Sequence, residues 1–193
     1  MRALGIDVGV RKGLDLVLLE KPRSVVQALS HVTVADLASL IAELKPDTIA
    51  IDSPPRFPND APRRTEVLIR KRGISLYATP WREEKKANKF YEWMKEGFKV
   101  FAACEVAGFP LFKGDSYVGS AFEVYPYGVA VVLSGYLRPK DVAKQAWRRG
   151  VLEARGVDTA SLKSGDQVDA ALAALTGLLA LDDRACSEGE PSW

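Results

Sequence analysis

The sequence predicts an α/β fold in which helices flank a five-stranded mixed sheet of three antiparallel strands followed by two parallel ones. The first three strand patterns follow one another with short turns between them, whereas helical patterns separate the last two. The strand patterns occupy residues 1–9, 13–20, 24–32, 47–52 and 120–125. A length of 193 residues, 47% of them hydrophobic, suits one domain over residues 1–193, with a helical insertion at about 64–107.

The first strand has one apolar face and one face that is almost bare of side chains. Leu4, Ile6 and Val8 lie on the apolar face, and Ala3, Gly5, Asp7 and Gly9 lie on the small face. A face of small residues allows a helix to approach closely, and Asp7 then lies at the edge of that contact. On its own, this stretch equally fits a plain strand that runs into a glycine turn.

Two later strands repeat this pattern of a small residue before an acid. In the strand over 47–52, Ala50 and Asp52 share a face, and in the strand over 120–125, Ala121 and Glu123 do. Between the third and fourth strands, Thr33 is a helix cap with Asp36 three residues on, and Pro46 ends the helix. The apolar stripe of this helix is Leu37, Leu40, Ile41 and Leu44.

The middle of the chain is basic and carries several aromatic residues. After a proline-rich loop at 53–62 we expect a short helix from about Arg64, an irregular segment at 73–80 and one long helix over 83–107. Its large side chains recur at helical spacing, which favours a core role for its aromatic residues over a base-stacking one. They are Phe90, Trp93, Met94, Phe98 and Phe101, followed by Ala102. Tyr77 and Trp81 either stack on bases or fill a gap in the core. The basic residues here are Arg63, Arg64, Arg70, Lys71, Arg72, Arg82, Lys85, Lys86, Lys89, Lys95 and Lys99.

Helices are also expected at 127–134, 139–155 and 166–181. The last of these has an apolar stripe beside a stripe of small residues, and Asp166 and Asp169 project together from its first turn. The alternative is that both acids only favour the positive end of the helix dipole. The helix dipole explains Asp166 as well as a metal site does. It explains Asp169 less well, because Asp169 has apolar neighbours.

Composition excludes several classes of function. Net charge is +2, from 27 basic and 25 acidic residues, so net charge alone does not indicate a nucleic-acid partner. The single histidine, His31, has no nearby nucleophile, and Cys104 and Cys186 fit neither a disulfide framework nor a metal motif. No apolar run approaches the roughly 20 residues that span a bilayer, and Asp7 interrupts any signal-peptide pattern. We therefore expect a cytoplasmic protein with no membrane partner, while its oligomeric state stays open.

The acids point to a metal site. If the last helix lies across the small strand faces, Asp7, Asp52, Glu123 and Asp169 converge at one end of the sheet, and their mutual repulsion requires compensation. Oxygen ligands without His or Cys select Mg²⁺ or Mn²⁺. Two such ions can activate water and stabilise the leaving oxygen of a phosphodiester, so the residues predict metal-dependent hydrolysis of nucleic acid.

The order of elements, with acids at the ends of the first and fourth strands and on the late helix, resembles the ribonuclease H-like fold. Two segments are similar to motifs of RuvC-type Holliday junction resolvases. A longer series of motifs, spread over nearly the whole chain, resembles more closely the family catalogued as Domain of Unknown Function 429. The RuvC-like segments are Gly5-Ile6-Asp7-Val8-Gly9 and Asp166-x-x-Asp169, and the family matches include Ile51-Asp52-Ser53-Pro54, Arg64-x-Glu66 with Arg70, Gly73-Ile74-Ser75, Glu123-Val124-Tyr125-Pro126 and Asp169-Ala170-Ala171-Leu172.

This resemblance implies the fold and a metal-dependent nuclease, but not a substrate, so DNA and RNA both stay open. It adds Asp166 to the candidate metal ligands, although this chain has Gly165-Asp166 where such sequences often have a His-Asp pair. Arg64 and Arg70 suit bidentate phosphate contacts. The alternative for Arg70 is a helical ion pair with Glu66.

Two other functions compete with the nuclease. The first is a nucleic-acid-binding or scaffold domain in which the acids only cap helices and form ion pairs. The second is an actin-like ATPase, which also opens with a strand that ends in Asp and Gly. The second is disfavoured because the chain is short and shows no further glycine-rich phosphate loop after residue 13.

Overall fold

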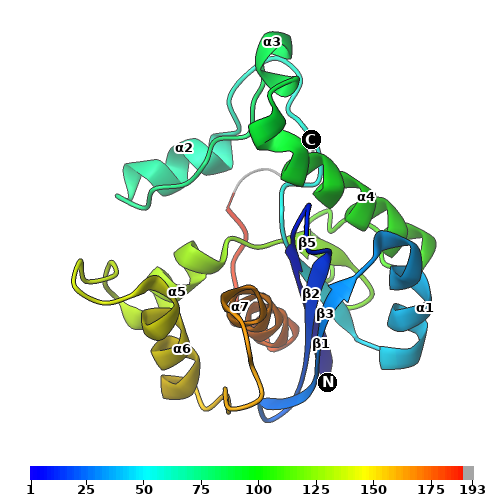
Figure 1. Ribbon diagram of the computed structural model, residues 1–193, viewed down its shortest axis with the longest axis vertical. Coiled ribbons are helices and arrows are strands. Elements are labelled where there is room, and N and C mark those ends of the chain that lie inside the picture. The colour runs from blue at the N-terminus through cyan, green and yellow to red at the C-terminus, as the bar shows by residue number, and fades with distance from the viewer. Residues whose placement is uncertain (189–193) are drawn as a thin grey trace.

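The computed structural model describes residues 1–188, and it contains one five-stranded sheet with strand order β3-β2-β1-β4-β5 (Figure 1). The strands are β1 (Arg2–Val8), β2 (Leu14–Glu20), β3 (Ser24–Val32), β4 (Thr48–Asp52) and β5 (Ala121–Glu123). Strands β1 to β3 are antiparallel to one another in sequence order, whereas β4 pairs in parallel with both β1 and β5. The mixed five-stranded sheet expected from the sequence is confirmed.

Helices cover both faces of the sheet (Figure 1). The apolar face of β1, with Leu4, Ile6 and Val8, packs against α1 (Val34–Leu44) and α4 (Glu92–Val106). On the other face lies α7 (Gly165–Leu181), which packs in turn against α5 (Pro126–Ser134) and α6 (Lys144–Ala154). The parallel strands β1 and β4 end at the same edge of the sheet, beside the first turns of α7.

The small face of β1 is in direct contact with the backbone of α7. A Cβ atom added to Gly5 would lie 1.9 Å from the carbonyl oxygen of Ala170 and 2.5 Å from the backbone nitrogen of Ala174. Further along the helix, a Cβ on Gly177 would lie 2.7 Å from the Cβ of Ala3. The close helix approach predicted from the small residues is confirmed, and it leaves no room for any side chain at Gly5.

Hydrogen bonds hold the first turn of α7 against the strands. The Ser164 side chain caps the helix by accepting from the backbone N–H of Gln167 (3.0 Å). The Gln167 amide donates to the Ser30 hydroxyl (3.0 Å), which donates to the buried carboxylate of Asp15 on β2. In α1 the Thr33 cap is also confirmed, because Thr33 accepts from the backbone N–H of Asp36 (3.3 Å).

The expectation of one long helix over 83–107 is wrong. The segment forms α3 (Glu83–Lys86), the 3-10 turn η1 (Lys89–Tyr91) and α4. Asn88 is extended between them, and its side chain accepts from the backbone N–H of Phe90 (2.8 Å). Asparagine competes for the backbone in this way and so favours helix caps over helix interiors. α2 (Arg64–Lys71) begins where the sequence indicated.

The helix expected over 139–155 begins only at Lys144, so its predicted start is also wrong. Ala143 is extended, with φ −59° and ψ 138°. The Arg138 guanidinium donates to the carbonyls of Pro139 (3.2 Å) and Val142, which holds 139–143 as an irregular turn. In the described part of the chain no helix has the length and apolar character that crossing a membrane requires.

Substitution of Gly5 by Ala should destabilise the protein by at least about 2 kcal/mol, because the new methyl group meets helix backbone and overpacking a core costs about 1–3 kcal/mol or more. Thermal unfolding measures this as a Tm lower by about 4–8 °C at 2–4 °C per kcal/mol. The matched control is Gly150→Ala in α6, where nothing lies within 4 Å of the added Cβ and helix propensity predicts a small gain. Equal Tm values for the two variants would contradict the tight contact.

Candidate metal centre

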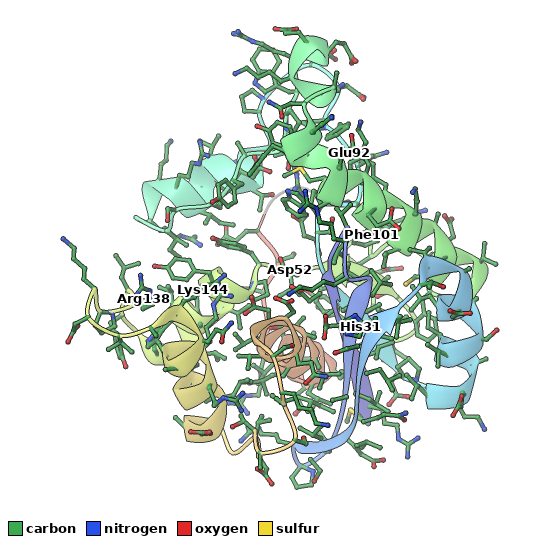
Figure 2. The ribbon with its side chains drawn as sticks, viewed as in Figure 1. His31, Asp52, Glu92, Phe101, Arg138 and Lys144 are labelled. Atoms are coloured by element: carbon green, nitrogen blue, oxygen red, sulfur yellow. The ribbon has the colours of Figure 1, made fainter. Side chains whose placement is uncertain are left out.

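Three carboxylates meet where β1, β4 and α7 come together. Asp7 and Asp52 are direct partners in the parallel register of β1 and β4, so their side chains leave the same face of the sheet. Asp169 is in the second turn of α7, above that face. Asp7, Asp52 and Asp169 each offer one carboxylate oxygen, and these oxygens all lie within 4.8 Å of one another. Figure 2 shows Asp52 next to α7 in the middle of the molecule.

Burial makes this group of acids electrostatically unfavourable when all three are charged. Burial, followed by repulsion from Asp52 and Asp169, raises the pKa of Asp7 to about 9. Burial and the charge of Asp169 raise the pKa of Asp52 to about 7. Burial also raises the pKa of Asp169, although Arg148 and Lys144 oppose that rise. The triad therefore binds protons at neutral pH unless positive charge is brought to it.

Two cations from α6 supply part of that charge. Arg148 is 4% exposed and donates to both carboxylate oxygens of Asp169, while Lys144 Nζ lies 3.9 Å from Asp169 Oδ2. The Nε atom of Arg148 is buried and has no hydrogen-bond partner among the described residues. Our sequence reasoning missed both residues as parts of the site. The available signal was their spacing of four, which puts them on one helix face beside the apolar Trp147 and Val151.

The structure does not bring Glu123 or Asp166 into this close group. The Glu123 carboxylate forms a two-pronged ion pair with Arg63, with Nη1 2.8 Å from Oε1. The Asp166 carboxylate is 45% exposed and lies 3.7 Å from Lys12 Nζ. Both residues nevertheless line the same pocket as the three aspartates. Their metal-binding roles stay predictions.

A buried network around Arg63 joins the helical insertion to β5. Arg63 is 4% exposed, and besides Glu123 it contacts Glu66 (3.4 Å) and Thr79 (3.4 Å). Glu66, also buried, accepts from the backbone N–H of Thr79 at 3.0 Å. The alternative that paired Glu66 with Arg70 is therefore wrong. Sequence reasoning missed Arg63 because nothing in the pattern separates it from the neighbouring Arg64.

Arg64 and Arg70 lie on α2 with exposed side chains. The Arg70 Nη2 atom donates to the carbonyl of Leu76 (2.9 Å) and so holds the turn after the helix. Neither residue is among those that line the pocket, so their proposed phosphate contacts require substrate to pass over α2.

The triad lies in a pocket of about 330 Å³ between the sheet edge, the helical insertion and α6. Acidic and basic groups both line it, some of them paired with each other, and the insertion adds aromatic and apolar residues. Its lining includes Asp7, Asp52, Arg63, Glu66, Leu76, Tyr77, Thr79, Trp93, Met94, Glu123, Tyr125, Lys144, Arg148, Asp166 and Asp169. A pocket of this size with convergent charged groups is suited to binding part of a ligand.

A family model described as "Protein of unknown function (DUF429)" matches residues 5–192. The chain belongs to this family. Its description assigns no activity to its members, so any function must be argued from the site. No curated protein is a significant sequence match.

Solved structures with a similar fold include RuvC from Thermus thermophilus. RuvC in complex with a Holliday junction substrate is 18% identical over 96% of this chain and 98% of that chain, with a TM-score of 0.56. A second Thermus thermophilus RuvC structure is 15% identical over 91% of each chain, with a TM-score of 0.49. The first match confirms the ribonuclease H-like fold expected for this member of the family.

The raised pKa of Asp7 predicts a pH-dependent stability without metal ions. The carboxyl has a pKa of about 9 in the folded protein and an ordinary value of 3.8, so its protonated form favours folding, and this contribution is lost as pH rises through about 9. In Asp7→Asn this loss of stability with rising pH should be much smaller. At pH 8 its free energy of unfolding should exceed that of the wild type by at least about 1 kcal/mol, which corresponds to a Tm higher by about 2–4 °C.

Thermal melts in EDTA between pH 5 and about 9 measure this difference. Asp141→Asn, at an exposed position away from the pocket, should melt like the wild type at every pH. A wild-type pH profile in Asp7→Asn would show that Asp7 is not held in a raised-pKa environment.

Proposed function

We propose that the protein is a metal-dependent nuclease that hydrolyses phosphodiester bonds of nucleic acid in the pocket of Asp7, Asp52 and Asp169. The observation that carries this proposal is the meeting of three carboxylates within 4.8 Å, one buried and two half-buried, supplied by two adjacent strand ends and the helix that crosses them. Such a group needs positive charge, and an oxygen-only donor set fits Mg²⁺ or Mn²⁺. When bound, a pair of these ions supplies an activated water and charge for the leaving oxygen.

The protein's own side chains have distinct roles in this proposal. Asp7, Asp52 and Asp169 hold the ions, and Glu123 and Asp166 on the pocket wall are further candidate ligands. Lys144, whose side chain is 60% exposed, and the buried Arg148 place positive charge on the side opposite β1, where a phosphate can bind. Arg64 and Arg70 supply exposed positive charge on α2, outside the pocket, for phosphates away from the cleaved bond.

Fold similarity supports nucleic acid as the substrate class, because one similar structure is described as RuvC with a Holliday junction substrate. The sheet, the triad and the basic α6 are compatible with either DNA or RNA. The assay panel therefore includes single strands, duplexes and four-way junctions of both.

Purified protein with Mn²⁺ or Mg²⁺ should cleave at least one member of this panel and be inactive in EDTA. Asp7→Asn and Asp169→Asn should each lower the cleavage rate by at least about 100-fold, since even outer partners of metal ligands contribute 10–100-fold. Gel analysis of labelled substrates measures the rate, and Asp141→Asn is the matched control. Undiminished cleavage in both triad variants would reject the proposed site.

Metal binding separates the nuclease from the inactive scaffold domain. Calorimetry with Mn²⁺ should show binding to the wild type and none to Asp7→Asn. Absence of binding in the wild type at any pH between 6 and about 9 would favour the scaffold function, because the triad would then have no cation to hold.

Arg148 should compete with metal ions for Asp169. Substitution by Gln removes a buried positive charge 21 residues away in sequence but in direct contact with the triad, so Mn²⁺ should bind about tenfold more tightly, while the metal-free protein should lose about 3 kcal/mol of stability. Electron paramagnetic resonance titration and melts in EDTA measure the two effects. Lys144→Gln should change Mn²⁺ affinity and metal-free stability in the same directions but by less, because Lys144 is exposed and its Nζ atom lies 3.9 Å from Asp169 Oδ2. Weaker Mn²⁺ binding in Arg148→Gln would contradict the competition.

A further inference from the structure

The helical insertion differs in charge from the rest of the protein. Residues 64–107 contain ten Lys or Arg and six Glu, a net charge of +4, whereas the remainder of the chain has a net charge of −2. The insertion lies beyond the ends of the strands, with α2 and α3 at the top of Figure 1. The positive charge therefore lies on the part of the molecule that closes the metal pocket from above.

An exposed aromatic surface lies on this insertion, and we call Tyr77, Phe90 and Tyr91 the aromatic platform. Tyr77 is 72% exposed and Phe90 is 48% exposed. Their ring centroids are 5.1 Å apart, and the rings of Phe90 and Tyr91 are also 5.1 Å apart. The core role expected for Phe90 is wrong, because the break at Asn88 turns it out of the helix. Of the two alternatives for Tyr77, its exposure rules out the one in which it fills a gap in the core.

Tyr77 belongs at once to the aromatic platform and to the metal pocket, whose lining includes it. Its backbone is held by three contacts. Arg70 donates to the carbonyl of Leu76 (2.9 Å), the Tyr125 hydroxyl donates to the carbonyl of Ser75 (2.6 Å), and Thr79 donates to Glu66. The exposed ring is thus carried by a fixed segment, which lowers the entropy lost when a ligand binds to it.

The segment that leads into Phe90 carries cations without an ion-pair partner. Arg82, Lys85 and Lys89 are exposed, and none of them forms an ion pair with another residue of the described chain. By contrast, three other lysines of the insertion are paired with Glu83, Glu92 and Glu96. The positive charge without an acidic partner therefore lies on residues 82–89, which directly precede Phe90 in the chain.

We propose that the aromatic platform binds unpaired bases of a single-stranded segment whose backbone continues into the metal pocket. Stacking requires an exposed base face, which single strands, loops and frayed ends offer and the interior of a duplex does not. The cations on 82–89 match the phosphates of such a strand. This inference rests on the proposed function and specifies it: the substrate has unpaired nucleotides beside the cleaved bond.

Fluorescence anisotropy in EDTA tests the platform without cleavage. The probes are a labelled oligodeoxythymidine of about 20 nucleotides and a duplex of the same length. Tyr77→Ala should weaken single-strand binding by roughly 5- to 150-fold, the range expected for one lost stacking partner, and Phe90→Ala should weaken it in the same direction. Duplex binding should change less than about twofold, because it depends on charge.

Two controls separate stacking from folding and from hydrogen bonding. Tyr77→Phe keeps the ring and should bind within about twofold of the wild type. Tyr136→Ala removes another exposed tyrosine, which is 55% exposed and does not line the pocket, and should leave binding unchanged. The double variant Lys85→Gln with Lys89→Gln should lower the magnitude of the slope of log binding constant against log salt concentration by about 1.4 for the single strand, or about 0.7 per phosphate contact. Tyr77→Ala should leave that slope unaltered.

Wild-type single-strand affinity in Tyr77→Ala would overturn the proposal, and so would an equal loss for single strand and duplex. Equal losses in Tyr77→Phe and Tyr77→Ala would also overturn it, because the hydroxyl and not the ring would then carry the contact. These outcomes are independent of cleavage. If single-strand binding depends on the Tyr77 ring but no metal-dependent cleavage is found, the platform is supported and the nuclease is rejected. If the protein cleaves but its single-strand binding does not depend on the ring, the nuclease is supported and the platform is rejected.

Discussion

The contact between the bare face of β1 and the backbone of α7 is the constraint on which the rest of the structure depends. At Gly5 the helix lies so close that a methyl group would overlap the carbonyl oxygen of Ala170. Closely packed interiors do not deform gradually, so this contact sets how deep the helix lies over the sheet. The height of Asp169 above Asp7 and Asp52 results from that depth. The geometry of the acids is thus a consequence of small residues several positions away.

This packing has an electrostatic cost that the protein meets only in part. Three carboxylates in a poorly solvated place repel one another, and burial alone already raises the pKa of each. Arg148 compensates one of them, yet its own Nε is left without a partner in the described structure. Functional sites typically break the rules that like charges are kept apart and that buried polar atoms are hydrogen-bonded. Both rules are broken where Arg148 meets Asp169. The pairing of Arg63 with Glu123 shows that the same pocket can also hold a balanced ion pair.

Local periodicity in the sequence predicted the sheet and the meeting of Asp7, Asp52 and Asp169, but it wrongly placed Glu123 in the same close group. Alternation located β1 and β4, and small residues before Asp7 and Asp52 predicted both the helix contact and the shared edge of the carboxylates. Local patterns were insufficient where one side chain competes with helix backbone, as at Asn88, or where a distant group decides burial. Arg63 and Arg64 are adjacent and alike in type, and only the position of Glu123, 60 residues away, makes the first a core residue.

The three aspartates come from the first strand, the fourth strand and the last helix, so distant parts of the chain must meet before the acidic site exists. A nascent polypeptide emerging from the ribosome can form the sheet meander and α1 long before residue 169 has been synthesised. Any chemistry that needs all three carboxylates is therefore withheld from unfinished or prematurely terminated chains.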